Sequence, residues 1–545
     1  MPSHPTSIWS RSPNKLRQSE IWLNCFYFTS LFLASLILFL INLGGLPLLD
    51  SNEGIVAQVA KEIYQQSHHL SSWIFPTLWG EAYLEQPPLI HGLVAIAYLI
   101  AGVNEFTTRL PGALLGAMSV VFMYKIGREI FVARFPALCS ALIYLTCLPV
   151  VRSSRLAMSD GPLLCFELIT IWAILRSRRD LRWSLVAGIG LGLMSLTKGV
   201  VALQIAAVIV GFLFWDTPRL LASPYFLGGI VLGAAPGISW YVAQSLHYYE
   251  LNAVKDMFDL FMGRISIERL DFKFSPLYYL IQSLQYIFPW IIIMFAGLKL
   301  ASRSIHWGWG KLIVVWLGVY LTIILLGFDG NYGFILPLYP GLALAGGKQL
   351  DLIRNLPSYI EYPADWTYGF ILMAVIAAFA GLHWGIRNYI DFYLPFICGS
   401  LAITFAATAI VIAQQEKQFI PLLFWGLFVS MFLLFISPHW IWELKAVEPV
   451  KPIAALIRQY TPKNQVVYSA MSQKRPSLEF YSDRRIINRG FDDLKAHWQE
   501  DPKHNLDVYL LVDAAAIEQL NIPMEMIFAN PQSDSVKWML AIKKT

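Results

Sequence analysis

The sequence alternates long apolar runs with short polar loops. The first run, Ile21 to Leu43, is about long enough to cross a bilayer, follows Arg11, Lys15 and Arg17, and lacks a small-residue cleavage site. It predicts an uncleaved first membrane helix, with residues 1–20 forming a cytoplasmic amino terminus.

The region from 44 to 111 does not read as a simple membrane span. In Asn52 to Tyr64, apolar residues recur at helical spacing beside Gln58, Lys61 and Glu62, the pattern of an amphipathic helix at the membrane interface. The segment Pro88 to Val103 is apolar but short, so it is read either as an interfacial or re-entrant helix or as a short span. Residues 44–111 are therefore expected to form a first outer loop.

The basic loops orient the remaining runs, because Lys and Arg concentrate on the cytoplasmic side. The densest basic loop, Arg176 to Arg182, is placed inside. Alternating inner and outer loops from this point predicts about thirteen membrane crossings and places the carboxyl-terminal tail on the outer side. The expected spans include 113–126, 137–151, 185–196, 200–215, 225–243 and 420–441, with a turn at Lys198 and a second outer loop at 244–275.

The tail, residues 443–545, changes composition and predicts a small extracytoplasmic α/β domain. It carries no nucleotide-binding glycine loop, and a lid, an acceptor-docking part and a purely structural part remain alternatives. Its expected strands are 465–470, 485–488 and 508–512, and its expected helices are 453–460, 492–498 and 514–520.

Composition supports a polytopic α-helical membrane protein. Of the 545 residues, 56% are hydrophobic and only 14% are charged, which a soluble globular protein of this size would not carry. The net charge of +5 comes from Lys and Arg residues concentrated in short loops. This distribution indicates the orientation of the chain in the membrane and does not indicate a nucleic-acid partner. All five cysteines lie in apolar stretches, so neither a disulfide framework nor a zinc site is indicated.

Four acidic residues on the predicted outer face are the main candidates for chemistry. Asp50, Glu53, Glu85 and Asp160 all lie just beyond apolar segments. Carboxylates at a bilayer surface are costly unless they are solvated, paired or used, so their clustering predicts a functional site. Ordinary loop acids are the alternative, and Asp50 and Asn52 are also common helix caps.

Cations on the same face depart from the positive-inside rule and suggest an anionic ligand. They are Arg152, Arg155, Lys198, Arg264 and Arg269. A carboxylate at this depth could take a proton from an acceptor hydroxyl, while a cation stabilises a leaving phosphate.

Six short motifs occur in a fixed order along the chain. They are Leu48-Leu49-Asp50-Ser51-Asn52-Glu53-Gly54, Tyr83-Leu84-Glu85-Gln86-Pro87-Pro88-Leu89, Asn104-Glu105-Phe106-Thr107-Thr108-Arg109-Leu110-Pro111, Arg155-Leu156-Ala157-Met158-Ser159-Asp160-Gly161-Pro162, Leu196-Thr197-Lys198-Gly199 and Ile335-Leu336-Pro337-Leu338-Tyr339-Pro340. Together with the topology, they resemble the GT-C superfamily of membrane glycosyltransferases, in the branch of the polyprenyl- and dolichyl-phosphate-mannose protein mannosyltransferases and the lipid A aminoarabinose transferases.

The resemblance implies a GT-C fold and transfer of a sugar from a polyprenyl-phosphate donor to an acceptor on the non-cytoplasmic face, usually with inversion. It implies Asp50 or Asn52 at the family's first-loop aspartate. Asp50 is favoured as the base because an amide cannot accept the proton, with Glu53 as its partner. The remaining matches are Asp160 as a third catalytic carboxylate and Glu85, Tyr83 and Lys198 as substrate-binding residues.

Some positions depart from the family pattern. Ile55-Val56 stand where the family often has Arg-Tyr, Gln86 stands where it often has Lys, and a further Lys is missing near Asp329. Donor phosphate needs cations, so Lys198, Arg155, Arg264 or Arg269 is expected to supply them.

The predicted partners are a polyprenyl-phosphate sugar donor, membrane lipids and an envelope lipid, glycan or protein acceptor, in a bacterial plasma membrane. No cofactor is required, although the residues leave open a divalent metal bridging Asp50, Asp160 and phosphate. Two alternatives remain: a transporter or flippase for a lipid-linked sugar, and a non-catalytic relative that binds lipid or acts as a scaffold.

Overall fold

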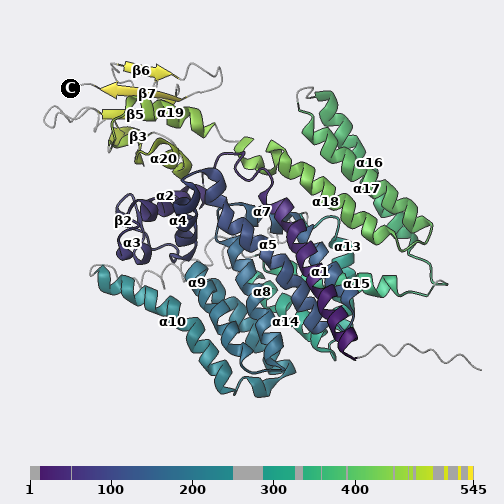
Figure 1. The fold of residues 1–545 in the computed structure, drawn as a ribbon. Coiled ribbons are helices and arrows are strands. Elements are labelled where there is room, and N and C mark those ends of the chain that lie inside the picture. Colours follow the sequence, from purple (N-terminus) through teal and green to yellow (C-terminus); the bar gives the residue numbers. More distant parts are fainter. Residues whose placement is uncertain are drawn as a thin grey trace, which may run out of the picture.

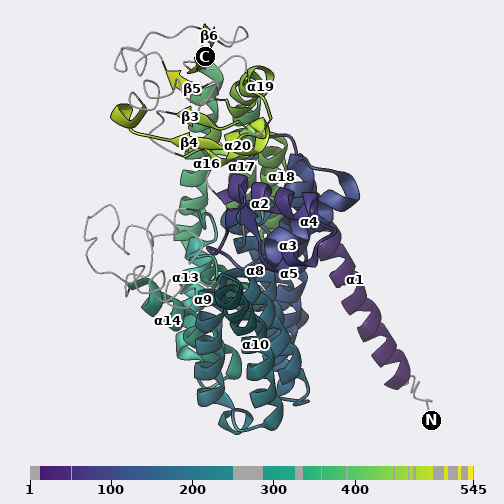
Figure 2. The same cartoon turned by 90° about the vertical axis from the view of Figure 1, so that its left-hand side faces the viewer.

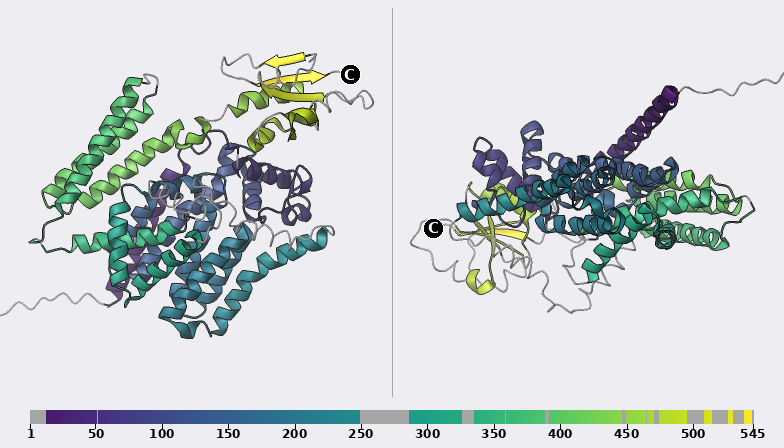
Figure 3. Two further views of the ribbon diagram at one scale, coloured as in Figure 1. Left: turned by 180° about the vertical axis from the view of Figure 1, so that it is seen from behind. Right: turned by 90° about the horizontal axis from the view of Figure 1, so that it is seen from below.

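The computed structural model divides into a large helical bundle and a small α/β domain seated at one end of it (Figure 1). It describes residues 13–545 except for the following: 51, 249–285, 326–334, 358, 388–390, 446–448, 464, 470–473, 495–507, 514–525, 530–537 and 544–545. Figure 2 and the left panel of Figure 3 also show the domain above the bundle, and the right panel of Figure 3 shows the molecule from below.

The bundle is built from helices that share one large apolar core. Its elements are α1 (Pro13–Leu40), α5 (Glu105–Ile130), α6 (Arg134–Leu145), α7 (Leu148–Arg155), α8 (Asp160–Ser177), α9 (Trp183–Asp216), α10 (Pro224–His247), α13 (Ile291–Arg303), α14 (Gly308–Leu325), α15 (Leu338–Arg354), α16 (Ala364–Arg387), α17 (Tyr393–Ala413) and α18 (Phe419–Ile436).

Among the described residues, seven helices are long and apolar enough to cross a membrane, or eight if α6 and α7 form one bent span. The chain is therefore a multi-pass membrane protein, as the composition predicts. The helix expected over 137–151 is two helices in the structure, because α6 and α7 meet at an angle of 57°. Pro149 lies in the first turn of α7, where its missing N–H is tolerated and its ring stops α6 from continuing.

Helix α9 is a helical hairpin that reverses at Lys198, as the sequence predicts. Lys198 has non-helical backbone angles, φ −156° and ψ 78°. A straight helix of 34 residues would be about 50 Å long. Instead, Arg178, just before its first residue, forms an ion pair of 3.0 Å with Asp216, its last. The expected spans 185–196 and 200–215 are therefore the two arms of α9.

The first outer loop forms a small layer on the bundle. It contains α2 (Asn52–Gln65), α3 (Leu70–Ile74), the short hairpin β1 (Thr77–Leu78) and β2 (Glu81–Ala82), and α4 (Leu89–Ala101). The predicted amphipathic helix agrees with α2, whose apolar face packs with α4 in a separate cluster that includes Val59, Ile63 and Val94. Helix α4 has only 13 residues, so the interfacial reading of 88–103 fits it better than a crossing.

The carboxyl-terminal domain contains a five-stranded mixed sheet with the strand order β4-β3-β5-β7-β6. Strand β3 pairs in parallel with β4 and β5, while β7 pairs antiparallel with β5 and β6. The elements are α19 (Val450–Tyr460), β3 (Val467–Ser469), α20 (Pro476–Ser482), β4 (Ile486–Asn488), β5 (Val508–Asp513), β6 (Met526–Ala529) and β7 (Trp538–Lys543).

The expected strands match β3, β4 and β5, and the expected helix at 453–460 falls within α19. Helix α20 and strands β6 and β7 were not expected. The helix expected at 492–498 is described only to Leu494, and the one expected at 514–520 lies outside the described residues.

Candidate active site

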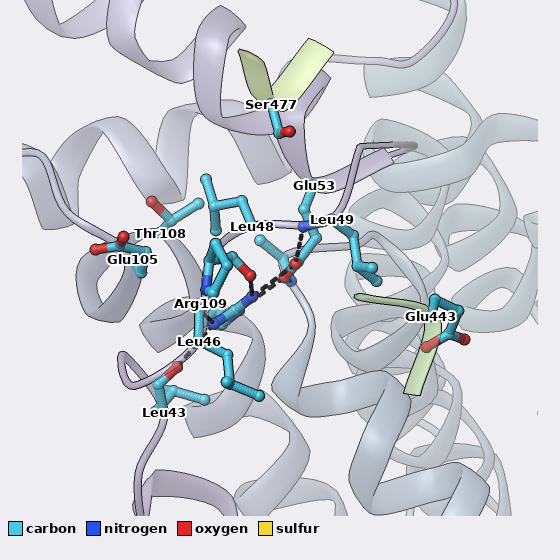
Figure 4. Close-up of polar contacts among 12 residues, drawn as sticks. Leu43, Leu46, Leu48, Leu49, Glu53, Glu105, Thr108, Arg109, Glu443 and Ser477 are labelled. Atoms are coloured by element: carbon cyan, nitrogen blue, oxygen red, sulfur yellow. Dashed lines mark hydrogen bonds and ion pairs between the residues drawn. The ribbon is translucent and has the colours of Figure 1, made fainter. Parts of the chain in front are cut away.

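A buried ion pair between Glu53 and Arg109 ties the first outer loop to the bundle (Figure 4). Both side chains are fully buried. Arg109 donates to Glu53 through Nε at 2.9 Å and Nη2 at 2.8 Å, which is the two-pronged geometry that makes such pairs strong. The carboxylate of Glu53 also accepts hydrogen bonds from the backbone N–H groups of Leu49 (2.9 Å) and Ala157 (2.7 Å). Glu53 therefore connects the loop after α1, the start of α5 and the segment after α7.

The local sequence explains why Arg109 reaches this position. Asn104 caps α5 by accepting a hydrogen bond from the Thr107 N–H at 2.9 Å, so Arg109 lies in the second turn. Its remaining N–H groups donate to the carbonyl oxygens of Leu43, Leu46 and Pro47 at 2.8–3.0 Å. All five guanidinium N–H groups are thus used, which a buried arginine requires.

Arg155 is buried in a similar position beside the end of α1. Its side chain is fully buried and donates to the carbonyl oxygens of Leu38 (2.5 Å) and Ile41 (2.6 Å) at the end of α1. The guanidinium also stacks on the rings of Phe435 and Trp440 at 4.4 and 4.5 Å. The described contacts of Arg155 are thus with the end of α1 and two aromatic rings, and its role in phosphate binding stays a prediction.

Lys198 and Asp160 face each other across the bundle end. The Lys198 ammonium lies 3.3 Å from Asp160 Oδ1, and both side chains keep partial exposure, 21% and 15%. Asp160 is the first residue of α8, and Lys198 occupies the reversal of α9, so two separate breaks in helical structure bring the pair together. Lys198 can therefore be approached by a ligand.

Asp50 is in direct contact with the carboxyl-terminal domain. Its Oδ2 accepts a hydrogen bond from Arg475 Nε at 3.0 Å, and its Oδ1 accepts one from the Ser477 hydroxyl. Both partners come from the start of α20, more than 400 residues away in the sequence. Asp50 and Asp160 belong to loops that touch, because Glu53, three residues after Asp50, binds Ala157, three residues before Asp160.

Further contacts seat the carboxyl-terminal domain on the first loop and on α5. Tyr481 accepts a hydrogen bond from the Leu48 N–H (2.9 Å) and donates one to Glu105 (3.0 Å), which also pairs with Lys451 (2.5 Å). Lys61 of α2 pairs with Asp483 at 2.7 Å. Burial alone would raise the pKa of Asp483, but the hydrogen bond and charge of Lys61 outweigh it, so the pKa lies below its ordinary value.

The other predicted site residues have mixed positions. Glu85 is exposed at the edge of the first loop. Tyr83 is buried against the His91 ring at 5.3 Å; burial and the nearby Glu85 charge raise the pKa of its hydroxyl, which stays protonated. Asn52 begins α2. The side chain of Asn52 and the residues Arg264 and Arg269 lie outside what the structure describes.

An apolar cavity of about 510 Å³ runs between the arms of α9 and α10 and ends beside this site. Gly199, next to Lys198, lines it together with Ser195, Ala202, Ala206 and Phe226. A second apolar cavity, of about 720 Å³, lies between α1, α6 and α18 and is lined by Ala34 among others. In the described part of the chain, no group of three or more His, Cys, Asp or Glu side chains could hold a metal ion.

Arg109, Arg475 and Ser477 were not among the site residues predicted from the sequence. Arg109 lies in one of the ordered motifs, and its placement near the start of a capped helix was the available signal. Arg475 and Ser477 gave no signal, because nothing in the tail sequence indicates that it contacts residue 50.

The fold resembles that of solved membrane glycosyltransferases. The chain superposes on ArnT from Cupriavidus metallidurans bound to undecaprenyl phosphate with a TM-score of 0.75 and 17% sequence identity, covering 94% of this chain and 97% of that one. It superposes on the oligosaccharyltransferase of Archaeoglobus fulgidus with a TM-score of 0.51 and 12% identity, covering 90% of this chain and 69% of that one.

Sequence comparison agrees with the fold. A family model described as dolichyl-phosphate-mannose-protein mannosyltransferase matches residues 85–241. An uncharacterized protein of Aquifex aeolicus is 25% identical over 83% of this chain and 86% of its own length. Undecaprenyl phosphate-alpha-4-amino-4-deoxy-L-arabinose arabinosyl transferase 1 of Pseudomonas fluorescens is 28% identical over 53% of this chain. That alignment spans 54% of the transferase's own length.

The resemblance drawn from the ordered motifs is thereby confirmed. The chain is similar in fold to ArnT and similar in sequence to the protein mannosyltransferase and aminoarabinose transferase families.

Proposed function

We propose that the protein transfers a sugar from a polyprenyl-phosphate donor to an acceptor hydroxyl on the non-cytoplasmic face, with inversion at the anomeric carbon. The observation that carries the proposal is the apolar cavity that ends beside Lys198, which pairs with Asp160. The segment leading into Asp160 touches the loop that holds Asp50, through the contact of Glu53 with Ala157. An apolar cavity whose lining includes Gly199, the residue next to Lys198, suits a lipid whose tail is apolar and whose headgroup is an anion.

In the proposed reaction, the acceptor oxygen attacks the anomeric carbon as the bond from that carbon to the phosphate oxygen breaks. The acceptor proton passes to the Asp50 carboxylate. Negative charge grows on the departing polyprenyl phosphate, and the Lys198 ammonium stabilises it. Asp160 orients Lys198 through the 3.3 Å contact.

Glu53 has a supporting role in this proposal. All of its contacts are hydrogen bonds that hold the loop in place, and its full burial keeps it from the acceptor. It therefore positions Asp50 and the Ala157 backbone and does not itself move the proton. Glu85 is exposed beside the loop and is proposed, with Asn52, Arg264 and Arg269, to contact substrate.

The donor is proposed to resemble those of the relatives. One relative is named for an undecaprenyl phosphate-linked amino sugar, and another has been crystallised with undecaprenyl phosphate. We propose an undecaprenyl-phosphate sugar as donor and a lipid, glycan or protein of the bacterial envelope as acceptor. The proposed location is the plasma membrane, with about thirteen crossings and the carboxyl-terminal domain outside. Activity in the presence of a chelator checks the expectation that no metal is required.

The test is mass spectrometry of polyprenyl-phosphate sugars and envelope glycans in cells that lack the gene, complemented with the wild type or Asp50→Asn. We expect one lipid-linked sugar to accumulate and one glycan to lose a residue, with only the wild type restoring both. Unchanged profiles in the deletion would contradict the transferase function and favour lipid binding or a scaffold. Full restoration by Asp50→Asn would remove Asp50 from the site.

A transporter of lipid-linked sugars is less well supported. Such proteins place paired charges at mid-membrane. Glu167, buried within α8, instead accepts a hydrogen bond of 3.2 Å from the neutral Tyr320 hydroxyl.

A further inference from the structure

We propose that the carboxyl-terminal domain completes the active site, with Arg475 and Ser477 acting as positioning residues for Asp50. The inference rests on the proposed function of Asp50 as the base. It assigns a role to residues of a domain that sequence reasoning left open between a lid, a docking part and a structural part.

The contact is specific in geometry. Arg475 Nε binds one carboxylate oxygen of Asp50 at 3.0 Å, and the Ser477 hydroxyl binds the other. Two donors on two different oxygens fix the plane of the carboxylate as well as its position. Each carboxylate oxygen has a second lone-pair site, so Asp50 keeps acceptor capacity for the proton of an incoming hydroxyl.

The pair is also shielded more than an ordinary surface ion pair. The side chains of Arg475 and Asp50 are only 9% and 20% exposed. A comparable bridge between the domain and the first loop, Arg485 to Glu81, is 38% and 71% exposed. Charge interactions weaken with solvent exposure, so the Arg475 pair has the stronger hold on its carboxylate.

The domain is seated independently of this pair. Lys61 with Asp483, Lys451 with Glu105, and Tyr481 with Leu48 and Glu105 anchor it at other points. Removing the Arg475 side chain should therefore leave the domain docked. We then expect its loss to change the orientation of Asp50.

The experiment compares transfer by the full-length protein carrying Arg475→Met, Arg475→Lys or Ser477→Ala, in the complementation assay and in purified form. Binding of undecaprenyl phosphate itself, measured by native mass spectrometry, serves as the donor-site probe. Arg485→Met is the matched control, because it removes a cation from the same domain that contacts the first loop but not Asp50.

We expect Arg475→Met to lower transfer by about 10- to 100-fold, the scale of a misplaced catalytic group. Undecaprenyl phosphate affinity and the unfolding temperature should remain close to wild type. Arg475→Lys should recover part of the rate, Ser477→Ala should cost less, and Arg485→Met should behave as wild type. In an Asp50→Asn background, Arg475→Met should cause no further loss, because it acts through the carboxylate.

Wild-type or faster transfer by Arg475→Met would overturn the inference, and faster transfer would identify the contact as a brake. A loss that adds to that of Asp50→Asn, or that follows undecaprenyl phosphate affinity, would also overturn it. If Asp50→Asn itself transfers normally, the proposed function of Asp50 fails, and that result is distinct from a failure confined to Arg475.

Discussion

At the residue scale, the site separates carboxylates that hold the structure from those that can react. Glu53 is fully buried, and both of its carboxylate oxygens accept hydrogen bonds from Arg109 and from backbone N–H groups. Asp50 and Asp160 instead keep partial exposure, and each has a cationic partner that a substrate could reach. The sequence gives no basis for this distinction, since Asp50 and Glu53 are three positions apart in one motif. In the proposed mechanism, burial separates their roles, because only Asp50 keeps solvent exposure.

Glu53→Gln should strongly destabilise the protein. It leaves the buried Arg109 guanidinium without its counter-charge, which typically costs about 3–5 kcal/mol. The measurement is thermal unfolding of the purified protein in detergent. Glu81→Gln, the same substitution in the exposed pair with Arg485, should leave the unfolding temperature nearly unchanged. Equal shifts in the two variants would contradict a structural role for Glu53.

Lys198→Met should weaken binding of undecaprenyl phosphate and reduce transfer together, because it removes the proposed phosphate cation. Loss of a charged hydrogen bond corresponds to about 1.5–3 kcal/mol, or roughly a tenfold or larger fall in affinity. Lys311→Met is a closely matched control: Lys311 also lies 3.3 Å from an aspartate, Asp216, at the opposite end of the bundle. If both variants bind undecaprenyl phosphate equally, Lys198 is not the phosphate ligand.

At the scale of elements, the sequence predicted what depends on local pattern. The amphipathic pattern predicted both ends of α2 to within one residue, and the polar break at Lys198 predicted the reversal of α9. It did not predict α20, because seven residues are too short to show a period. Nor could it predict that α20 docks against residue 50, because that pairing depends on how separate parts pack in space.

The docking of α20 on α2 depends on Gly54. A Cβ atom at this position would lie 2.4 Å from the Ser477 backbone nitrogen and 2.7 Å from the Pro476 carbonyl carbon, so α20 would have to move. Gly54→Ala should therefore displace Ser477 from Asp50, lower transfer, and expose the domain boundary to protease. Gly92→Ala in α4 is the control, since its Cβ would meet only ordinary contacts at 3.7 Å. Wild-type transfer and protease resistance in Gly54→Ala would show that close packing here is not needed.

At the scale of the whole molecule, the two ends of the bundle differ in charge. The end away from the site gathers basic residues around few acids: Lys125 and Arg176 stack near Trp172, while Arg178 and Lys311 share Asp216. The site end carries the carboxylates and the carboxyl-terminal domain (Figure 1). By the positive-inside rule, we expect the basic end to face the cytoplasm.

This orientation predicts which positions an impermeant thiol reagent can reach in intact cells. Leu181→Cys, in the exposed basic loop, should react only after the membrane is opened, whereas Lys474→Cys, exposed beside α20, should react in intact cells. Background should be low because, of the five native cysteines, only Cys25 is exposed in the structure, and it lies within α1. The proposed chemistry depends on this result, since an acceptor in the envelope can meet Asp50 only if the domain faces outward. Labelling of Leu181→Cys alone in intact cells would reverse the orientation, place the carboxylates in the cytoplasm and exclude an extracytoplasmic acceptor.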